Sequence, residues 1–145
     1  EEGNMKKDLH YMLLVAFNRS NKVITRQILE KGLMPGQPKI LEFLLENDGC
    51  TQKEIGKGCV LDKSTVTSLL SRMEENGLVS RESQKGDRRI VRIFLTPLGR
   101  EKAEIVREIG SRLDESAWKG IPEEERRRFT GIYEKVIRNL EELEE

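Results

Sequence analysis

Apolar side chains recur every three or four residues over most of this chain, and that period predicts a mainly helical fold. The first apolar stripe covers residues 9–28 and ends near Gly32, a residue type that commonly stops helices. Pro35 and Pro38 then open a second helix, which ends at the turn-forming sequence Asn47-Asp48-Gly49. The chain therefore begins with two predicted helices.

A pair of short helices separated by a turn is predicted next. Thr51-Gln52-Lys53-Glu54 matches a capping box, in which the Thr hydroxyl and the Glu carboxylate each bind a free backbone amide, and it opens a helix through about Gly58. Asp62 occupies the N-cap position of the following helix, residues 62–76. Gly77 stands where helices commonly end in a left-handed residue.

Strand-like segments follow this helix pair. Leu78-Val79 and residues 90–95 predict two strands, joined by the basic tip Gln84-Lys85-Gly86-Asp87. Thr96-Pro97 then starts a long helix, and Gly120-Ile121-Pro122 separates it from the last one. The predicted fold class is therefore mainly α with a small β-hairpin.

The terminal helices carry more apolar surface than a core of this size can cover. Residues 35–96 supply three helices and one hairpin, whereas the flanking helices add three further apolar stripes. A twofold homodimer is the simplest way to cover those stripes, because interfaces between identical chains are usually isologous. We therefore interpret residues 5–34 as an N-terminal dimerisation helix, residues 35–96 as a central lobe, and residues 97–145 as C-terminal dimerisation helices.

The helix over residues 62–76 has one apolar face and one face rich in hydroxyl groups. Its apolar positions share one side of the helix: Val66, Leu69, Leu70 and Met73. The outward side carries Ser and Thr, which let a backbone approach base edges and phosphates closely, whereas an ordinary solvated face is rich in Lys and Glu. Glu74 and Glu75 would repel phosphates, so contact with DNA is expected at the N-terminal half of the helix.

Positive charge is concentrated locally, although the chain is neutral overall with 26 Lys plus Arg against 26 Asp plus Glu. Residues 81–92 hold several cations and span the hairpin that directly follows the hydroxyl-lined helix. A helix and a cationic hairpin in this order are typical of modules that read duplex DNA. The predicted DNA-binding residues are Gln52, Lys53, Lys63, Ser64, Thr65, Thr67, Ser68, Arg72, Arg81, Lys85, Arg88 and Arg89.

Side-chain chemistry indicates separate roles within this set. Arg89 is the best candidate for insertion into a minor groove, because narrow grooves attract arginine. Gln52 and Lys53, at a helix N-terminus, are suited to a backbone phosphate. Asp87 is expected to orient a nearby arginine, either Arg72 or Arg89, since a carboxylate that faces phosphates would be repelled.

Other kinds of chemistry find little support in the sequence. No apolar run is long enough for a membrane span and no signal-peptide pattern is present, so we expect a cytoplasmic protein without a membrane partner. His10 is the only histidine, and Cys50 and Cys59 are interpreted as reduced structural thiols, so neither a metal nor another cofactor is expected. The carboxylates come with no nucleophile and no Gly-rich phosphate loop, and we therefore predict no enzymatic activity.

Several blocks of the sequence, taken in order and at their separations, match one known family. The blocks are Leu33-Met34-Pro35-Gly36-Gln37, Thr51-Gln52-Lys53-Glu54-Ile55-Gly56, Ser64-Thr65-Val66-Thr67, Met73 through Arg81, Asp87-Arg88-Arg89 and Leu95-Thr96-Pro97-Leu98-Gly99. They resemble the start of the second helix, the start of the third helix, the recognition helix and the wing of the MarR transcriptional regulators. The resemblance spans nearly the whole chain.

This resemblance implies a winged helix-turn-helix with N- and C-terminal dimerisation helices. It implies a homodimeric repressor with recognition helix 62–76 and wing 81–92 on a pseudo-palindromic DNA site. It also implies release by a small apolar or aromatic ligand, for which Tyr11 and Met34 are candidate contacts. Two alternatives stay open: a winged-helix module that binds protein, which the neutral total charge favours, and a thiol-based redox regulator that uses Cys50 or Cys59.

Overall fold

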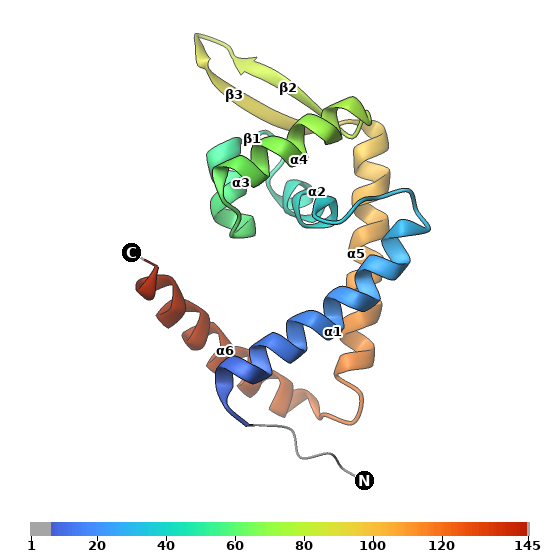
Figure 1. The fold of residues 1–145 in the computed structure, drawn as a ribbon, viewed down its shortest axis with the longest axis vertical. Coiled ribbons are helices and arrows are strands. Elements are labelled where there is room, and N and C mark those ends of the chain that lie inside the picture. The colour runs from blue at the N-terminus through green and yellow to red at the C-terminus, as the bar shows by residue number, and fades with distance from the viewer. Residues whose placement is uncertain (1–6, 145) are drawn as a thin grey trace. The chain divides into compact units, whose positions relative to one another are not determined.

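The computed structural model describes residues 7–144, and these form six α-helices and one three-stranded antiparallel sheet (Figure 1). Contacts within the chain define two compact units, one ending at Leu113 and one beginning at Asp114. The elements are α1 (Leu9–Leu29), α2 (Gln37–Glu46), β1 (Cys50–Thr51), α3 (Gln52–Cys59), α4 (Lys63–Glu75), β2 (Val79–Gln84), β3 (Asp87–Leu95), α5 (Pro97–Ala117) and α6 (Glu123–Leu143).

The ends of α3 and α4 follow from local hydrogen bonding that the sequence predicts. Thr51 Oγ1 accepts a hydrogen bond from the Glu54 amide at 3.2 Å, and the Glu54 carboxylate accepts one from the Thr51 amide at 3.4 Å. The capping box is therefore confirmed. Asp62 caps α4, and Gly77 after that helix has a φ of 74°, the left-handed conformation that glycine adopts without steric cost.

The sheet has one strand more than the hairpin that the sequence predicts. Strand β1 pairs with β3 on the side away from β2, with Cys50 opposite Ile93 and Thr51 opposite Arg92. A strand of two residues is too short to show an alternating pattern, which is why sequence reasoning placed only a turn and a helix start there. The first strand of the hairpin also runs further than predicted, from Val79 to Gln84.

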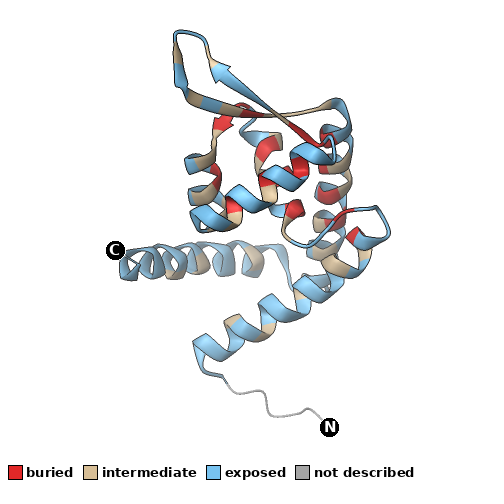
Figure 2. Cartoon of the chain, turned by 45° about the horizontal axis from the view of Figure 1, so that its top comes forward, coloured by how far each residue is buried: buried red, intermediate tan, exposed pale blue. Residues whose placement is uncertain are grey.

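A single hydrophobic core lies inside the first unit (Figure 2). Helix α2 is at its centre, because Ile40, Leu41 and Leu44 are fully buried. The first half of α5 packs into the same core through Ala103 and Val106. The segment boundaries predicted at residues 34 and 96 separate roles in dimerisation and binding rather than separate cores, and they stay a prediction. Residues 5 and 6 of the predicted N-terminal dimerisation helix lie outside the described part of the chain.

Helices α1 and α6 leave most of their apolar side chains exposed. Ile28 is the one buried residue of α1, and none of the described residues of α6 is buried. In the second unit, the Phe129 ring lies edge-on to Trp118 at 5.8 Å and stacks on Tyr133 at 5.3 Å. No helix in residues 7–144 combines the length and the apolar character needed to cross a membrane.

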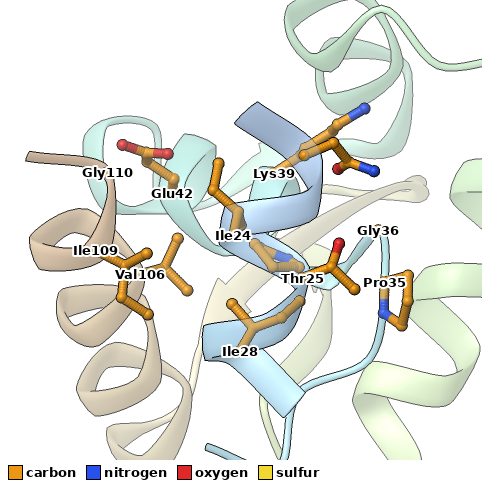
Figure 3. A pocket seen from close by; sticks show the side chains of 12 residues that line it. Ile24, Thr25, Ile28, Pro35, Gly36, Lys39, Glu42, Val106, Ile109 and Gly110 are labelled. Atoms are coloured by element: carbon orange, nitrogen blue, oxygen red, sulfur yellow. The ribbon is translucent and has the colours of Figure 1, made fainter. Parts of the chain in front are cut away.

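A small pocket lies where α1, α2 and the middle of α5 meet (Figure 3). Its volume is about 110 Å³. Ile24, Ile28, Val106 and Ile109 form an apolar wall, and α2 brings both a positive charge, Lys39, and a negative charge, Glu42, to the lining. Tyr11 and Met34 are exposed and do not line this pocket.

Candidate nucleic-acid interface

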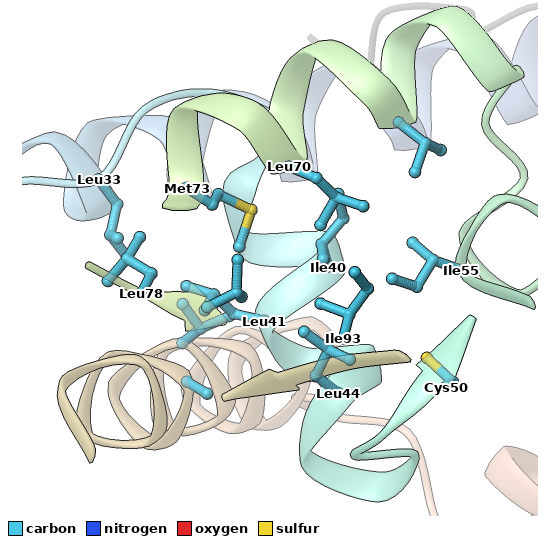
Figure 4. Packing of buried hydrophobic residues seen from close by; sticks show 14 of the residues in the cluster. Leu33, Ile40, Leu41, Leu44, Cys50, Ile55, Leu70, Met73, Leu78 and Ile93 are labelled. Atoms are coloured by element: carbon cyan, nitrogen blue, oxygen red, sulfur yellow. The ribbon is translucent and has the colours of Figure 1, made fainter. Parts of the chain in front are cut away.

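Helix α4 is fixed by its apolar face and presents its hydroxyl face to solvent. Val66, Leu70 and Met73 are fully buried, and Figure 4 shows Leu70 and Met73 pointing into the cluster that also holds Ile40. Leu69 is half-buried. On the opposite side the following residues are exposed: Ser64, Thr67, Ser68, Ser71 and Arg72. The division of this helix into an inward and an outward face is as the sequence predicts.

Asp62 organises the N-terminal end of α4. Its Oδ1 atom accepts hydrogen bonds from the Thr65 amide at 2.7 Å and from Ser64 Oγ at 2.8 Å. These hydrogen bonds, the one from the Thr65 amide first, lower the pKa of the Asp62 carboxyl below its ordinary value of 3.8. The group is therefore ionised at neutral pH, so it acts only as an acceptor.

A hydrogen bond joins α3 to α4 across the helix-turn-helix. Gln52 Nε2 donates to Thr67 Oγ1 at 2.5 Å, and Thr67 Oγ1 donates to the Lys63 carbonyl at 2.8 Å. The contact spans the two helices, so it couples the start of α3 to the outward flank of α4.

Three lysines surround an open hollow beside the start of α4. Lys53 and Lys57 of α3 and Lys63 of α4 line it, while Leu61 and Val66 contribute apolar surface. Its volume is about 590 Å³. Sequence reasoning included Lys53 and Lys63 but missed Lys57, although Lys57 follows Lys53 by one helical turn, a spacing that places both on one face.

The hairpin of β2 and β3 carries its exposed cations at its tip. The Arg89 side chain is 91% exposed, and Lys85 and Arg88 are exposed as well. Asp87 Oδ1 accepts hydrogen bonds from Arg89 Nε at 3.1 Å and from the Arg89 amide at 3.0 Å. The hydrogen bond from the Arg89 side chain, followed by that from its amide, lowers the pKa of the Asp87 carboxyl. Asp87 thus fixes the position of the Arg89 guanidinium through its Nε atom.

Arg92 links the two strands of the hairpin to each other and to the segment before β1. The Arg92 guanidinium donates to Gln84 Oε1 at 3.0 and 2.8 Å and to the Gly49 carbonyl at 3.0 Å. The sequence alone indicates no specific role for Gln84 or Arg92. The available signal was the alternation along β3, which places Arg92 on the opposite face from the buried Ile93.

Arg81, like Arg89, has an acidic partner. Its Nε atom lies 3.3 Å from Glu74 Oε2 at the end of α4. Glu74 is one of the two carboxylates that would repel a phosphate on this helix. The ion pair places a positive charge beside that carboxylate.

Neither cysteine has the environment of a reactive thiol. Burial, with a smaller contribution from the Glu54 carboxylate, raises the pKa of Cys50 from 9.0 to about 11. Burial also raises the pKa of Cys59, against an opposing effect of Lys39. Both groups are thiols rather than thiolates at neutral pH, and the thiolate is the nucleophile.

Comparison with known proteins identifies similar sequences and folds. A family model described as the MarR family matches residues 31–90. The HTH-type transcriptional repressor IacR of Pseudomonas putida is 30% identical over 105 residues, which cover 72% of this chain and 63% of that protein. The match thus spans less than two thirds of the repressor's length. The HTH-type transcriptional regulator MgrA of Staphylococcus aureus is 28% identical over 100% of this chain and 98% of its own.

A solved structure has the same fold as this chain. It is a MarR family transcriptional regulator from Listeria monocytogenes, in complex with a 26mer DNA. It superposes with a TM-score of 0.86 at 24% identity, over 94% of this chain and 90% of that one. The winged helix-turn-helix fold expected from the sequence is confirmed by this likeness.

Proposed function

Because the chain belongs to the MarR family of transcriptional regulators, we propose that it is a repressor that binds duplex DNA as a homodimer in the cytoplasm. The observation that carries the proposal is the exposed hydroxyl face of α4, held outward by the buried Val66, Leu70 and Met73. The cation-bearing hairpin follows that helix directly in the chain. A major groove admits such a helix, and small side chains let it lie close to base edges.

Two copies of α4 would read a pseudo-palindromic operator. A twofold dimer places equivalent helices in successive major grooves about 34 Å apart, one turn of DNA. Exposed apolar side chains on α1 and α6 support this association, because a monomer would leave them in water. These side chains are Leu9, Met12, Leu14, Phe17, Phe129, Ile132, Ile137, Leu140 and Leu143.

Backbone phosphates would supply most of the affinity. The hollow lined by Lys53, Lys57 and Lys63 brings three positive charges to one place beside the N-terminus of α4. Lys85 and Arg88 on the hairpin add two more. Each neutralised phosphate releases counterions, so affinity should fall with salt by about one logarithmic slope unit per contact.

Arg89 is the residue that we propose for the minor groove. Its side chain is almost fully exposed, and Asp87 holds it at the hairpin tip. Arginine at a protruding tip is attracted by the strong negative potential of a narrow groove.

The experiment is fluorescence polarisation on labelled random duplex at several salt concentrations. Arg89→Ala should weaken binding on every sequence. It should also reduce the slope of affinity against salt by about one unit, because Arg89 would no longer neutralise a phosphate beside the minor groove. Arg107→Ala is the matched control, because it also removes one exposed positive charge but lies on α5, where it pairs with Glu46. An unchanged affinity and slope for Arg89→Ala would make the wing assignment wrong.

Sedimentation of the same samples tests the dimer. A monomer with no affinity for duplex at low salt would instead support the protein-binding alternative. A dimer that binds duplex supports the proposed function, and selection of a preferred site from random duplex would then give the operator.

We further propose that the pocket between α1, α2 and α5 takes the small effector, rather than Tyr11 or Met34. Its wall is apolar, and its lining holds one cation, Lys39, and one acid, Glu42, so an anionic group of a ligand would lie beside Lys39 and away from Glu42. At about 110 Å³ it is smaller than the roughly 150 Å³ cavity that holds benzene in a protein core. An aromatic ring would therefore have to push α1 and α5 apart from α2. This movement would change the position of the proposed dimerisation helices relative to the DNA-binding lobe.

Thermal melting with aromatic carboxylates tests this effector site. A compound that raises the melting temperature of the intact chain should lose its effect in Ile109→Trp, which fills the pocket, and in Lys39→Gln if the anion matters. No shift with any aromatic carboxylate would remove the effector from the proposal and leave DNA binding untouched.

A further inference from the structure

The hydroxyl groups on α4 are not equivalent, because some of them already have partners within the protein. This inference rests on the proposed DNA binding and concerns which residues choose the sequence. Ser64 donates its only hydroxyl hydrogen to Asp62 Oδ1 at 2.8 Å. Asp62 is ionised and also accepts a hydrogen bond from the Thr65 amide, so the Ser64 hydroxyl hydrogen and the Thr65 amide are both already bonded within the protein. Ser64 can offer a base only a lone pair.

Thr67 is also engaged on both sides of its hydroxyl. Its hydrogen goes to the Lys63 carbonyl at 2.8 Å, and a lone pair accepts from Gln52 Nε2. The Gln52 side chain must therefore present its NH₂ group, not its oxygen, to Thr67, because the only hydroxyl hydrogen of Thr67 is already donated to Lys63. Gln52 and Thr67 therefore form a link that fixes α3 relative to α4.

Ser68 and Arg72 have no such partners. The two residues are one helical turn apart, and both are exposed; Arg72 lies beyond the N-terminal half of the helix, where the sequence predicts the contact with DNA. Within residues 7–144, neither side chain has a hydrogen bond or an ion pair to the protein. Glu75, three positions beyond Arg72 and therefore its neighbour on the helix surface, forms no ion pair with it within residues 7–144.

We propose that Ser68 and Arg72 determine the DNA sequence that this protein selects, whereas Gln52 and Thr67 are positioning residues. The Arg72 guanidinium can donate two parallel hydrogen bonds to O6 and N7 of guanine, the commonest specific contact in major grooves. A serine hydroxyl reads bases ambiguously, so Arg72 sets the guanine and Ser68 modulates the neighbouring position. Each operator half-site accordingly contains one guanine read by Arg72.

The test selects duplexes from a pool with a randomised centre of about 20 base pairs, two turns of DNA. The wild-type protein and its variants are each used for selection, and the bound duplexes are sequenced. Arg72→Lys keeps the charge but loses the planar fork, so preference for that guanine should fall about 5- to 150-fold. Arg88→Lys is the matched control, because it makes the same chemical change on the wing and should leave the selected sequence unchanged.

The positioning role is tested with Thr67→Val and Thr67→Ser. Valine keeps the shape of threonine but removes the hydroxyl, so affinity should fall by up to about tenfold on all sequences while base preference is kept. Serine restores the hydroxyl and should restore the affinity. Gln52→Leu should lower affinity as Thr67→Val does, and the double variant should be no weaker than either single one.

The outcomes separate this inference from the proposed function. If the wild-type protein selects no sequence and binds no duplex at low salt, the proposed function is wrong and the inference falls with it. If it selects a clear sequence and Arg72→Lys selects the same one, DNA binding stands and the role of Arg72 is overturned. If Thr67→Val changes a base preference that Thr67→Ser keeps, Thr67 is a reader and not a positioning residue.

Discussion

The guanidinium of Arg92 donates two hydrogen bonds to the side-chain oxygen of Gln84, at 3.0 and 2.8 Å. Arg92 lies on β3 and Gln84 ends β2, so the pair spans the hairpin at the point where its pairing register shifts. A third hydrogen bond, to the Gly49 carbonyl, ties the same side chain to the segment before β1. Arg92 thus adds a side-chain link between the hairpin and this segment to the backbone pairing of β1 with β3.

Arg92→Ala should therefore loosen the hairpin. It leaves Gln84 Oε1 and the Gly49 carbonyl without this donor, and the expected loss of unfolding free energy is about 1–3 kcal/mol. Urea denaturation measures this loss. Arg88→Ala, at an exposed position of the same strand, should change stability by less than about 0.5 kcal/mol. Equal effects of the two substitutions would contradict the anchoring role of Arg92.

Gly99 marks a close approach between α5 and the start of β2. A Cβ atom at this position would overlap the Leu78 carbonyl oxygen, which is backbone and has little freedom to move. Gly99→Ala should destabilise the fold by about 1–3 kcal/mol through overpacking. Gly110→Ala on the same helix meets its nearest atom at 3.9 Å and should stabilise the fold by up to about 1 kcal/mol. Thermal denaturation of both variants would show opposite signs, and a shared sign would refute the close-packing argument.

The cap of α4 should depend on pH through Asp62. Its carboxyl pKa is lowered in the folded state, so the stabilisation is fully present above the ordinary value of 3.8 and is lost as pH falls through the folded pKa. Asp62→Asn keeps an N-cap acceptor for the Thr65 amide but removes the charge. The wild-type protein should melt higher than Asp62→Asn at pH 7, and the gap should shrink as the pH falls below 3.8. A gap that stays constant over this range would mean that ionisation of Asp62 does not stabilise the helix.

The thiols should resist oxidants and alkylating agents. The pKa of Cys50 rises from 9.0 to about 11, which lowers its thiolate fraction near neutral pH by about 100-fold. Iodoacetamide at pH 8 should therefore label Cys50 far more slowly in the folded protein than in urea. Hydrogen peroxide should leave DNA affinity unchanged. A loss of affinity that disappears in Cys50→Ser or Cys59→Ser would instead support the redox alternative.

The inward and outward groups of α4 could be predicted from the sequence because their signals are local. The period of Val66, Leu70 and Met73 fixes the inward face of α4, and that alone decides which side Ser68 and Arg72 occupy. The capping box at Thr51 was found for the same reason, since both partners lie within four residues. The side-chain links of these groups were not found, because Gln52 and Thr67 or Arg92 and Gly49 are far apart in the chain.

The amino-acid sequence by itself determined the order of the helices, the place of the hairpin and the outward face of α4. These features depend on periodicity and on capping chemistry within a few residues. Only the tertiary structure decided that β1 adds a third strand, that the pocket lies against Lys39 rather than Tyr11, and that Thr67 is held by Gln52 while Arg72 is not. Such facts depend on which distant segments pack together, and packing is decided by the burial of the whole core rather than by any one stretch of sequence.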